Sequence, residues 1–435
     1  MESPPFAGEK AMVDIGSQRS PRGSCGHRDV PPTSIGLCYQ AMFSSRTRWE
    51  LSPNQLSLRL EKRRRAGLPI LDLTESNPTG CEISYPSDEI LAALSSPGSL
   101  IYEPSPKGLL EARVAIARYY AERGAKVDPE QIIMTASTSE AYAFIFRLLA
   151  NPQDRIVVPR PSYPLIDFLA TLNDVHIDPY PLRYERGWRI DFGTLAGSVS
   201  DRSRAILLVN PNNPTGSFLQ RGERDSLVEF CRVRELAIVS DEVFADYAFV
   251  PNRDRVETMA GTREALTFAL GGISKLLGLP QMKLAWICAS GPVDLLNRAL
   301  GRLEVIADTY LSVNTPAQRA LPRWLALCDE LTQQIRTRVL MNRRYLIDPS
   351  QASPVYTCLD AEGGWYSVLR IPEIESEERL VLELLDSEGV LVHPGYFYDF
   401  DTDGYLVVSL LPPTPIFQCG IDRMLMHLRA KAHRG

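Results

Sequence analysis

The chain has 435 residues, too many for one small core, and its 44% hydrophobic and 23% charged residues are typical of an ordinary globular protein. Its net charge of −6 at pH 7 gives no electrostatic reason to expect nucleic acid, so small molecules are the expected partners. No apolar stretch is long enough to cross a bilayer, so we expect no membrane partner either.

The cysteines are scattered, without CxxC pairs and without histidines nearby, so we expect neither a metal site nor a disulfide framework. The eight are Cys25, Cys38, Cys81, Cys231, Cys288, Cys328, Cys358 and Cys419. Because this usage is typical of a reducing compartment, we expect a cytoplasmic protein.

Residues 1–41 are rich in proline and glycine and have little periodic apolar content, which predicts a disordered N-terminal extension. Whether the mature protein contains this extension stays open, and Met42 is a candidate functional start. We expect the segment 42–70 to fold with a smaller, C-terminal domain.

Strand and helix patterns alternate through the middle of the chain. Apolar residues at helical spacing predict helices over 109–122 and 140–149. Strands are predicted at 70–73, 156–158, 205–209, 236–239 and 267–270, with helix-length segments such as 223–235 between them. This alternation predicts a doubly wound α/β body. A long helical stretch over 316–344 then leads into a final α+β region.

Three polar side chains follow three of these strands. The turn-forming segment NPNNPTG, which contains Asn213, follows the strand at 205–209; Asp241 follows the strand at 236–239; and Lys275 follows the strand at 267–270. Open parallel sheets bind ligands at the carboxyl ends of their strands. An amide, a carboxylate and an amine that converge there suit a pyridine aldehyde held as a Schiff base.

The ordered set NPNNPTG, Ser240-Asp241-Glu242 and Ser274-Lys275 resembles the class I and II aminotransferases, pyridoxal 5′-phosphate (PLP) enzymes of fold type I, from about residue 71 onward. The resemblance implies a large PLP-binding domain over 71–315 with a mostly parallel, seven-stranded type of sheet flanked by helices. Residues 316–435 would form a linking helix and a small α+β domain. It also implies a homodimer.

The resemblance assigns roles to the three strand-end residues. Lys275 would carry PLP as a Schiff base and move a proton, Asp241 would pair with the protonated ring nitrogen, and Asn213 would donate to the phenolic oxygen. Each has a simpler reading, respectively a surface lysine, a carboxylate that caps a turn, and a turn former.

Further residues match cofactor-binding positions of the family. Tyr163 would stack on the ring, although a buried core tyrosine would look the same. Ser137, Thr138 and Ser139 precede a helix and would bind phosphate, or serve only as N-cap residues. Ser274 adjoins the lysine. Tyr102 would reach the phosphate of the neighbouring subunit.

Four positions depart from the family's pattern. Phe244 stands where a tyrosine is usual, Lys283 replaces a phosphate-binding arginine, and Gly272 replaces a phosphate-contacting serine. Val407 stands where the family holds the substrate α-carboxylate with an arginine, and a valine cannot bind a carboxylate. Either another cation substitutes, with Arg46, Arg48, Lys107 and Arg370 as candidates, or the substrate lacks a conventionally bound α-carboxylate.

The leading hypothesis is a PLP-dependent aminotransferase that moves an amino group from a small amine or amino acid to a keto acid through Lys275. A PLP-dependent lyase or decarboxylase on the same fold is the alternative, because the bond that is broken depends on its orientation to the ring. A non-catalytic ligand-binding relative is a third reading.

Overall fold

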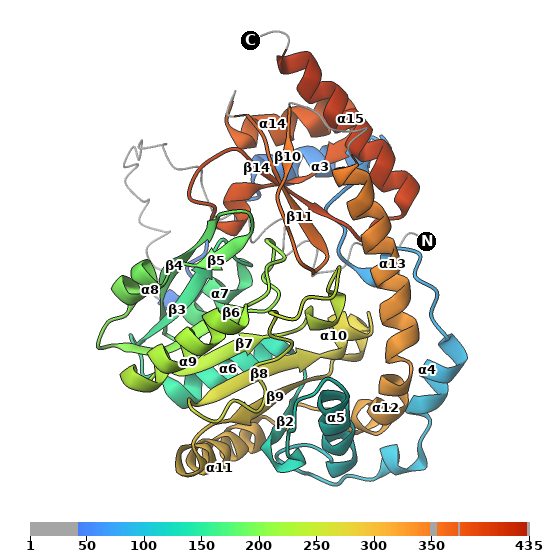
Figure 1. Ribbon diagram of the computed structural model, residues 1–435. Coiled ribbons are helices and arrows are strands. Elements are labelled where there is room, and N and C mark those ends of the chain that lie inside the picture. Colours follow the sequence, from blue (N-terminus) through green and yellow to red (C-terminus); the bar gives the residue numbers. More distant parts are fainter. Residues whose placement is uncertain (1–41, 349–354, 373–374, 433–435) are drawn as a thin grey trace.

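The computed structural model describes residues 42–348, 355–372 and 375–432. The predicted N-terminal extension, residues 1–41, lies outside the described residues. Within these ranges the chain forms a large eight-stranded sheet, a small four-stranded sheet and the helices around them (Figure 1). No described helix combines the length and the apolar character that a membrane span needs.

The large sheet is mostly parallel, and its strand order is β2-β9-β8-β7-β6-β3-β4-β5. In that order the strands are Ile132–Thr135, Ala285–Ser290, Thr267–Gly272, Ala237–Asp241, Ser203–Val209, Arg155–Arg160, His176–Tyr184 and Trp188–Ile190. Strand β9 is antiparallel to both of its neighbours, and β5 adds an antiparallel hairpin at the edge. The predicted α/β architecture is confirmed, with eight strands where seven are expected.

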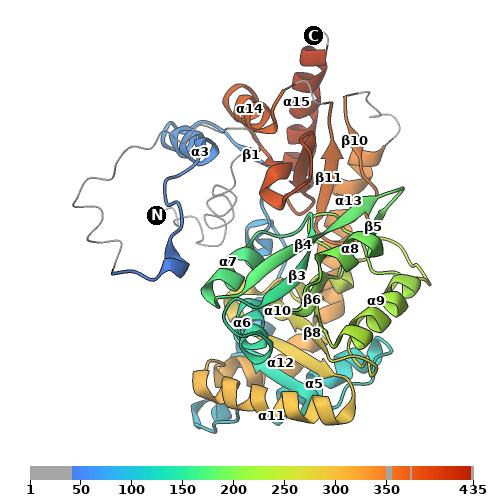
Figure 2. The same ribbon diagram turned by 90° about the vertical axis from the view of Figure 1, so that its left-hand side faces the viewer.

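Helices cover both faces of this sheet. Successive side chains of a strand point to opposite faces, and in the central strands the side chains on both faces are apolar. Ala205 and Leu207 of β6 pack with α6 (Thr138–Leu149), α7 (Leu165–Leu172) and α11 (Val293–Tyr310). Ile206 and Leu208 pack with α8 (Phe192–Ser198) and α9 (Arg221–Arg234) on the other face. Figure 2 shows α6 and α7 on one side of the strands and α8 and α9 on the other.

A third apolar cluster lies at the β2 end of the sheet, where α4 (Ser87–Leu94), α5 (Leu110–Glu122) and α12 (Thr315–Ala326) pack together. The helical stretch predicted over 316–344 is confirmed, and it consists of two consecutive helices. It is divided at Leu327, whose backbone leaves the helical conformation between α12 and α13 (Cys328–Ile347).

The small sheet has the order β10-β11-β14-β13 and is covered by α15. In that order the strands are Thr357–Cys358, Tyr366–Arg370, Tyr405–Ser409 and His393–Pro394. Three helices lie nearby, α3 (Gln55–Arg65), α14 (Glu377–Glu383) and α15 (Thr414–Ala432). A separate pair of short parallel strands, β1 (Leu71–Asp72) and β12 (Val390–Leu391), also belongs to this part. Helix α13 runs from the large sheet up to this layer (Figure 1). The domain boundaries expected at residues 41, 70 and 315 stay predictions.

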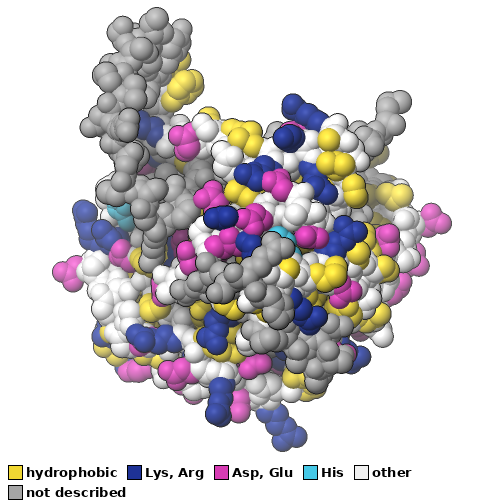
Figure 3. All heavy atoms as spheres, turned by 90° about the horizontal axis from the view of Figure 1, so that it is seen from above, with side chains coloured by type: hydrophobic (Ala, Val, Ile, Leu, Met, Phe, Trp, Pro, Cys, Tyr) yellow, Lys and Arg dark blue, Asp and Glu magenta, His cyan; other side chains and the backbone are white. Residues whose placement is uncertain are grey.

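Basic and acidic side chains are interspersed on the face seen in Figure 3. Among the surface ion pairs of the described residues, Arg379 and Lys431 both pair with Glu383, on α14 and α15. Such exposed pairs contribute about 0–1 kcal/mol each, so this face is a solvated surface held mainly by the packing beneath it.

Candidate active site

The three strand-end side chains come together because β6, β7 and β8 are adjacent and parallel. Val209 pairs with Asp241, and Asp241 pairs with Leu270, so the three strands end side by side. Asn213 lies in the turn after β6, Asp241 is the last residue of β7, and Lys275 lies in the single-turn helix α10 (Ile273–Leu276) directly after β8.

Lys275 points toward an aromatic wall. Its Nζ lies 5.8 Å from the ring centre of Phe244 and 5.1 Å from that of Trp365, which belongs to the loop before β11. Burial lowers the pKa of Lys275 from its ordinary 10.5 to about 8, and the charges of Glu75 and Asp241 oppose that shift. A neutral amine, the form that attacks an aldehyde, is therefore accessible near physiological pH.

This shift predicts how fast the protein without cofactor attaches PLP at different pH values. The rate should rise with pH around a midpoint near 8 and level off above about pH 9, because the neutral amine then predominates. Stopped-flow absorbance of the visible band, with Nα-acetyl-lysine as the control amine, measures it. A rate that still climbs tenfold between pH 9 and 10 would show an unshifted lysine.

Asp241 is held by two donors. The hydroxyl of Tyr142 donates to its Oδ2 at 2.8 Å, and the amide of Val243 donates to Oδ1 at 3.2 Å. Burial raises the pKa of Asp241, while these two hydrogen bonds and the charge of Lys275 oppose the rise. The carboxylate is thus fixed in direction and poorly solvated, which favours a cationic partner such as a protonated ring nitrogen.

Asn213 differs from the other asparagines of its turn. Both polar atoms of the Asn210 side chain have partners, because its Nδ2 donates to the carbonyl of Val256 and its Oδ1 accepts from the amide of Leu219. The Oδ1 of Asn212 accepts from the hydroxyl of Thr215. Asn213 is buried, and its Oδ1 has no hydrogen-bond partner among the described residues. The turn-forming explanation therefore suits Asn210 and Asn212 better than Asn213.

Tyr163 is partly buried near Asp241. Burial, followed by the charge of Asp241, raises the pKa of Tyr163 to about 12, so its phenol stays neutral. The neighbouring amide of Ser162 donates to the carbonyl of Tyr398 at 2.9 Å, which ties this segment to the small domain.

The hydroxyl residues at the start of α6 form a helix N-terminus. Ser137 is the N-cap, and its Oγ accepts from the amide of Glu140 at 3.1 Å. The carboxylate of Glu140 in turn accepts from the amide of Ala136 at 2.7 Å. Thr138 and Ser139 lie in the first turn, where helix amides and hydroxyls can bind an anion. The capping role of Ser137 is observed, and phosphate binding by all three stays a prediction.

The structure leaves other predicted residues less engaged. Lys283 is exposed and has a left-handed backbone, and Tyr102 is 77% exposed on the loop before α5. Ser274 is partly buried in α10 beside Lys275. Gly272 has a local reason to be glycine, because a Cβ would lie 3.0 Å from the Cβ of Ala285 in the next strand.

Other residues also line this region. Tyr142 comes from α6, and Glu75 follows β1. The small domain adds Trp365, Tyr366, His393 and Tyr398. Only the helical spacing of Tyr142, four residues after Thr138, carried a local signal; the others depend on how the small sheet packs on the large one.

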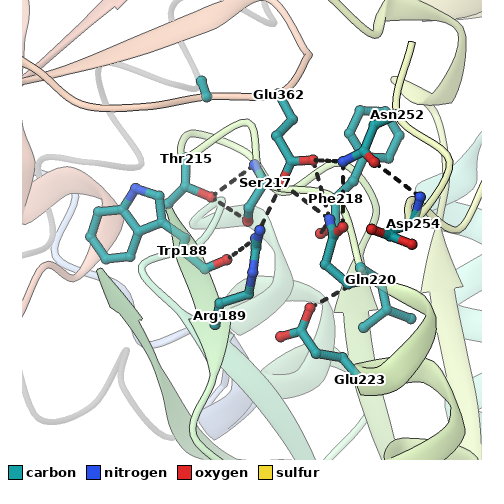
Figure 4. Close-up of polar contacts among 12 residues, drawn as sticks. Trp188, Arg189, Thr215, Ser217, Phe218, Gln220, Glu223, Asn252, Asp254 and Glu362 are labelled. Atoms are coloured by element: carbon teal, nitrogen blue, oxygen red, sulfur yellow. Dashed lines mark hydrogen bonds and ion pairs between the residues drawn. The ribbon is translucent and has the colours of Figure 1, made fainter. Parts of the chain in front are cut away.

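A polar network fixes the loop that carries Trp365 to the NPNNPTG turn (Figure 4). The carboxylate of Glu362 accepts from Arg189 at 3.1 Å, from Gln220 at 3.2 Å and from Asn252 at 3.3 Å. The amide of Glu362 donates to the carbonyl of Gly216 at 2.9 Å. The aromatic wall beside Lys275 is therefore positioned by the same turn that carries Asn213.

Gly216 is the point of closest approach in this contact. Its φ is +67°, and a Cβ there would lie 2.4 Å from the carbonyl oxygen of Gly363. We expect Gly216→Ala to lower the free energy of unfolding by at least about 2 kcal/mol in equilibrium urea titrations. The matched control is Gly222→Ala in α9, where no atom lies within 4 Å of the added Cβ, and where about 0.5–1 kcal/mol of stabilisation is expected. Equal effects of the two changes would contradict the prediction.

These residues fit PLP. A lysine with a lowered pKa, a partly buried carboxylate, an asparagine side-chain amide that can donate, and a helix N-terminus with hydroxyls match its aldehyde, ring nitrogen, phenolic oxygen and phosphate in chemical type. No group of three or more metal-ligating side chains occurs in the described part of the chain.

Comparisons with known proteins agree with this site. The model of the family described as aminotransferase class I and II matches residues 69–412. The glutamate-pyruvate aminotransferase AlaA of Haemophilus influenzae is 27% identical over 363 residues, covering 82% of this chain and 89% of that protein. The alanine aminotransferase of Mycobacterium tuberculosis is 26% identical over 369 residues, covering 82% and 85%.

A solved structure shows the same fold. The alanine aminotransferase from Pyrococcus furiosus superposes with a TM-score of 0.79 at 23% identity, covering 86% of this chain and 96% of that one. The resemblance inferred from the strand-end motifs, and the fold and cofactor it implied, are confirmed. The chain belongs to the class I and II aminotransferases, enzymes that use pyridoxal 5′-phosphate to transfer amino groups.

Proposed function

We propose that Lys275 binds PLP and moves the proton in a transamination between a small amino donor and a keto acid, carried out in two half-reactions at one site. The position of Lys275 between Asp241 and the aromatic wall, with a pKa near 8, is the observation that supports it. When bound, PLP supplies an electron-accepting ring that stabilises a carbanion at the substrate's α-carbon.

The protein residues have separate tasks in this proposal. Asp241 holds a proton on the ring nitrogen, supported by the donors Tyr142 and Val243. The side-chain amide nitrogen of Asn213 donates to the phenolic oxygen, and Tyr163 packs on the ring. Ser137, Thr138 and Ser139 bind phosphate at the start of α6, with Ser274 and Lys283 as further contacts. Phe244 restricts the space beside Lys275 through its ring.

Product analysis tests the reaction type. The protein is loaded with PLP, mixed with a panel of amino donors without acceptor, and the released cofactor is identified by chromatography. Pyridoxamine phosphate that forms in proportion to the keto product supports transamination. Release of ammonia or carbon dioxide, with the cofactor recovered as PLP, would instead establish the lyase or decarboxylase alternative. Binding without any conversion would favour the non-catalytic relative.

We also propose a homodimer that covers the exposed apolar residues around Tyr102. Leu100 is 92% and Leu311 is 58% exposed, and Tyr102 and Leu311 line the same surface pocket. Apolar groups of this kind are typical of protein interfaces. In this arrangement Tyr102 would serve the partner's phosphate site. Light scattering tests it, and a monomer at micromolar concentration would contradict it.

We also propose that the protein is located in the cytoplasm, because the cysteines in the described part of the chain are present as thiols. Cys231, Cys288 and Cys328 are buried and form no disulfide among the described residues. Free thiols are typical of a reducing compartment. Fractionation of the native host with an antibody against the protein measures the location directly.

A further inference from the structure

Tyr247 is a buried tyrosine that holds the main chain of Lys275. It is the last residue of the 3₁₀ turn η5 (Ala245–Tyr247), which follows Asp241 and β7, and it is only 1% exposed. Its hydroxyl oxygen lies 2.7 Å from the carbonyl oxygen of Lys275 and 3.1 Å from that of Leu276. The single hydroxyl proton is therefore donated to this pair of carbonyls, one of which belongs to the lysine itself.

The helix that carries Lys275 gains little from its own hydrogen bonds. Helix α10 has one turn, and the last four carbonyls of a helix have no partner inside it. So short a helix depends on tertiary contacts for its stability. The amide of Gly278 donates to the carbonyl of Lys275 at 3.2 Å, and the shorter bond from Tyr247 comes from another element. That bond therefore fixes α10 relative to the end of β7, which carries Asp241.

The ring of Tyr247 contacts the aromatic wall that Lys275 faces. Its centre lies 5.1 Å from that of Trp365 in a T-shaped arrangement, and the Nζ of Lys275 lies 5.1 Å from the same Trp365 ring. The carbonyl of Tyr247 accepts from the amide of Gly364, directly before Trp365, at 3.0 Å. One residue thus fixes both the backbone from which the amine extends and the surface against which the amine lies.

The hydroxyl of Tyr247 acts as a neutral donor. Burial raises the pKa of Tyr247 well above its ordinary value of 10, so the phenol keeps its proton at neutral and mildly alkaline pH. The lysine side chain is a flexible four-carbon stem, so a small shift of its backbone moves the amine by a similar distance. A misplacement of about 1 Å can slow a reaction by about 10²-fold.

We propose that Tyr247 is a positioning residue for Lys275, with a hydroxyl that fixes the main chain of the lysine and a ring that fixes the wall beside its amine. This inference rests on the proposed attachment of PLP to Lys275. Without the hydroxyl, the amine would point in several directions. Attachment of PLP would then slow, while the preceding noncovalent binding of PLP, which depends on other residues, would change little.

The kinetics of PLP attachment test the proposal without an amino donor. The full-length protein, freed of cofactor, is mixed with increasing concentrations of PLP, and the rise of the visible band is followed by stopped-flow absorbance. The limiting rate constant reports attachment, and the half-saturating PLP concentration reports the binding that precedes it. We expect Tyr247→Phe, which keeps the ring, to lower the limiting rate constant at least about tenfold. The half-saturating concentration should stay within about threefold of the wild-type value.

Tyr85→Phe is the matched control. Tyr85 is a partly buried tyrosine whose hydroxyl donates to the carbonyl of Gly278 at 2.7 Å, three residues beyond Lys275. Its hydroxyl holds the same loop but not the lysine, so the limiting rate constant should stay within about threefold of the wild-type value. A first-order constant does not depend on the folded fraction. All proteins are measured in sucrose, which favours the folded state and so provides folded Tyr247→Phe.

Two results would overturn the assignment of Tyr247. One is a limiting rate constant of Tyr247→Phe that falls less than tenfold. The other is an equal fall in Tyr85→Phe, which would show that any loosening of this loop slows attachment.

Failure of the proposed function gives a different result. If the visible band persists in Lys275→Ala, Lys275 has no role in attachment, and the role of Tyr247 falls with it. If PLP attaches to Lys275 but the product analysis finds ammonia or carbon dioxide, the proposed transamination fails while the positioning role of Tyr247 stands.

Discussion

Replacing Lys275 by alanine is expected to lower the rate of the first half-reaction by at least about 10³-fold and to remove the visible band of bound cofactor. The structure gives the reason, since Lys275 is the only lysine or arginine of the described residues whose amine lies against Phe244 and Trp365. Its removal takes away both the attachment point and the group that moves the proton. Single-turnover absorbance with an active donor measures the rate.

The control for this change is Lys126→Ala, which removes an exposed lysine at the surface. It should leave both band and rate unchanged. Borohydride reduction of the wild-type protein with PLP, followed by peptide mass analysis, should place the adduct on Lys275. An adduct on another lysine, or a Lys275→Ala protein within tenfold of the wild-type rate, would remove Lys275 from its role.

The sequence could predict the strand-end residues because each follows an apolar run with its own turn chemistry. Val209, Asp241 and Leu270 then fall into register through the parallel pairing of β6, β7 and β8, which such runs imply. The position of Lys275 needs no long-range information beyond that pairing. This part of the site is therefore encoded locally.

The other half of the site depends on contacts that no local pattern shows. His393 reaches Val407 because the two-residue strand β13 pairs with β14, and the loop that places Trp365 beside Lys275 is held by long-range contacts, among them the network around Glu362. Such a short strand carries no period-2 signal. Phe244 shows the same limit, since the sequence shows only that a tyrosine is usual at this position, whereas the structure adds a T-shaped contact with Trp365 at 5.2 Å.

Details of the elements that the sequence does not show have similar causes. Strand β4 has the sequence HIDPYPLRY, in which two prolines argue against a strand, yet it pairs with β3 in parallel over six residues. The helical stretch over 316–344 is divided at Leu327, and its first part, α12, packs with α4 and α5, which no local pattern shows.

Asp241→Asn is expected to lower kcat by about 10²–10³-fold and to change KM of the donor much less. Asparagine keeps the size of the side chain and one oxygen, which can accept from Val243, while its amide nitrogen can donate to the hydroxyl oxygen of Tyr142, but it cannot hold a proton on the ring nitrogen by charge. The loss therefore falls on the reacting state more than on binding. Steady-state kinetics over a range of donor concentrations measures the two constants separately.

The thermal stability of the Asp241→Asn protein should stay the same or rise while its kcat falls. This contrast distinguishes a lost catalytic role from a damaged fold. Because burial raises the pKa of Asp241 in the folded protein, its ionised form destabilises the fold at every pH above the unfolded value near 3.8, and the substitution removes that cost. The Asp241→Asn protein without cofactor should unfold at the wild-type temperature or higher at pH 7. Tyr142→Phe supplies the intermediate case, since it keeps the charge and removes only one donor, and it should lower kcat by about tenfold or less. If Tyr142→Phe were as slow as Asp241→Asn, orientation of the carboxylate, and not its charge, would be the property that the site depends on.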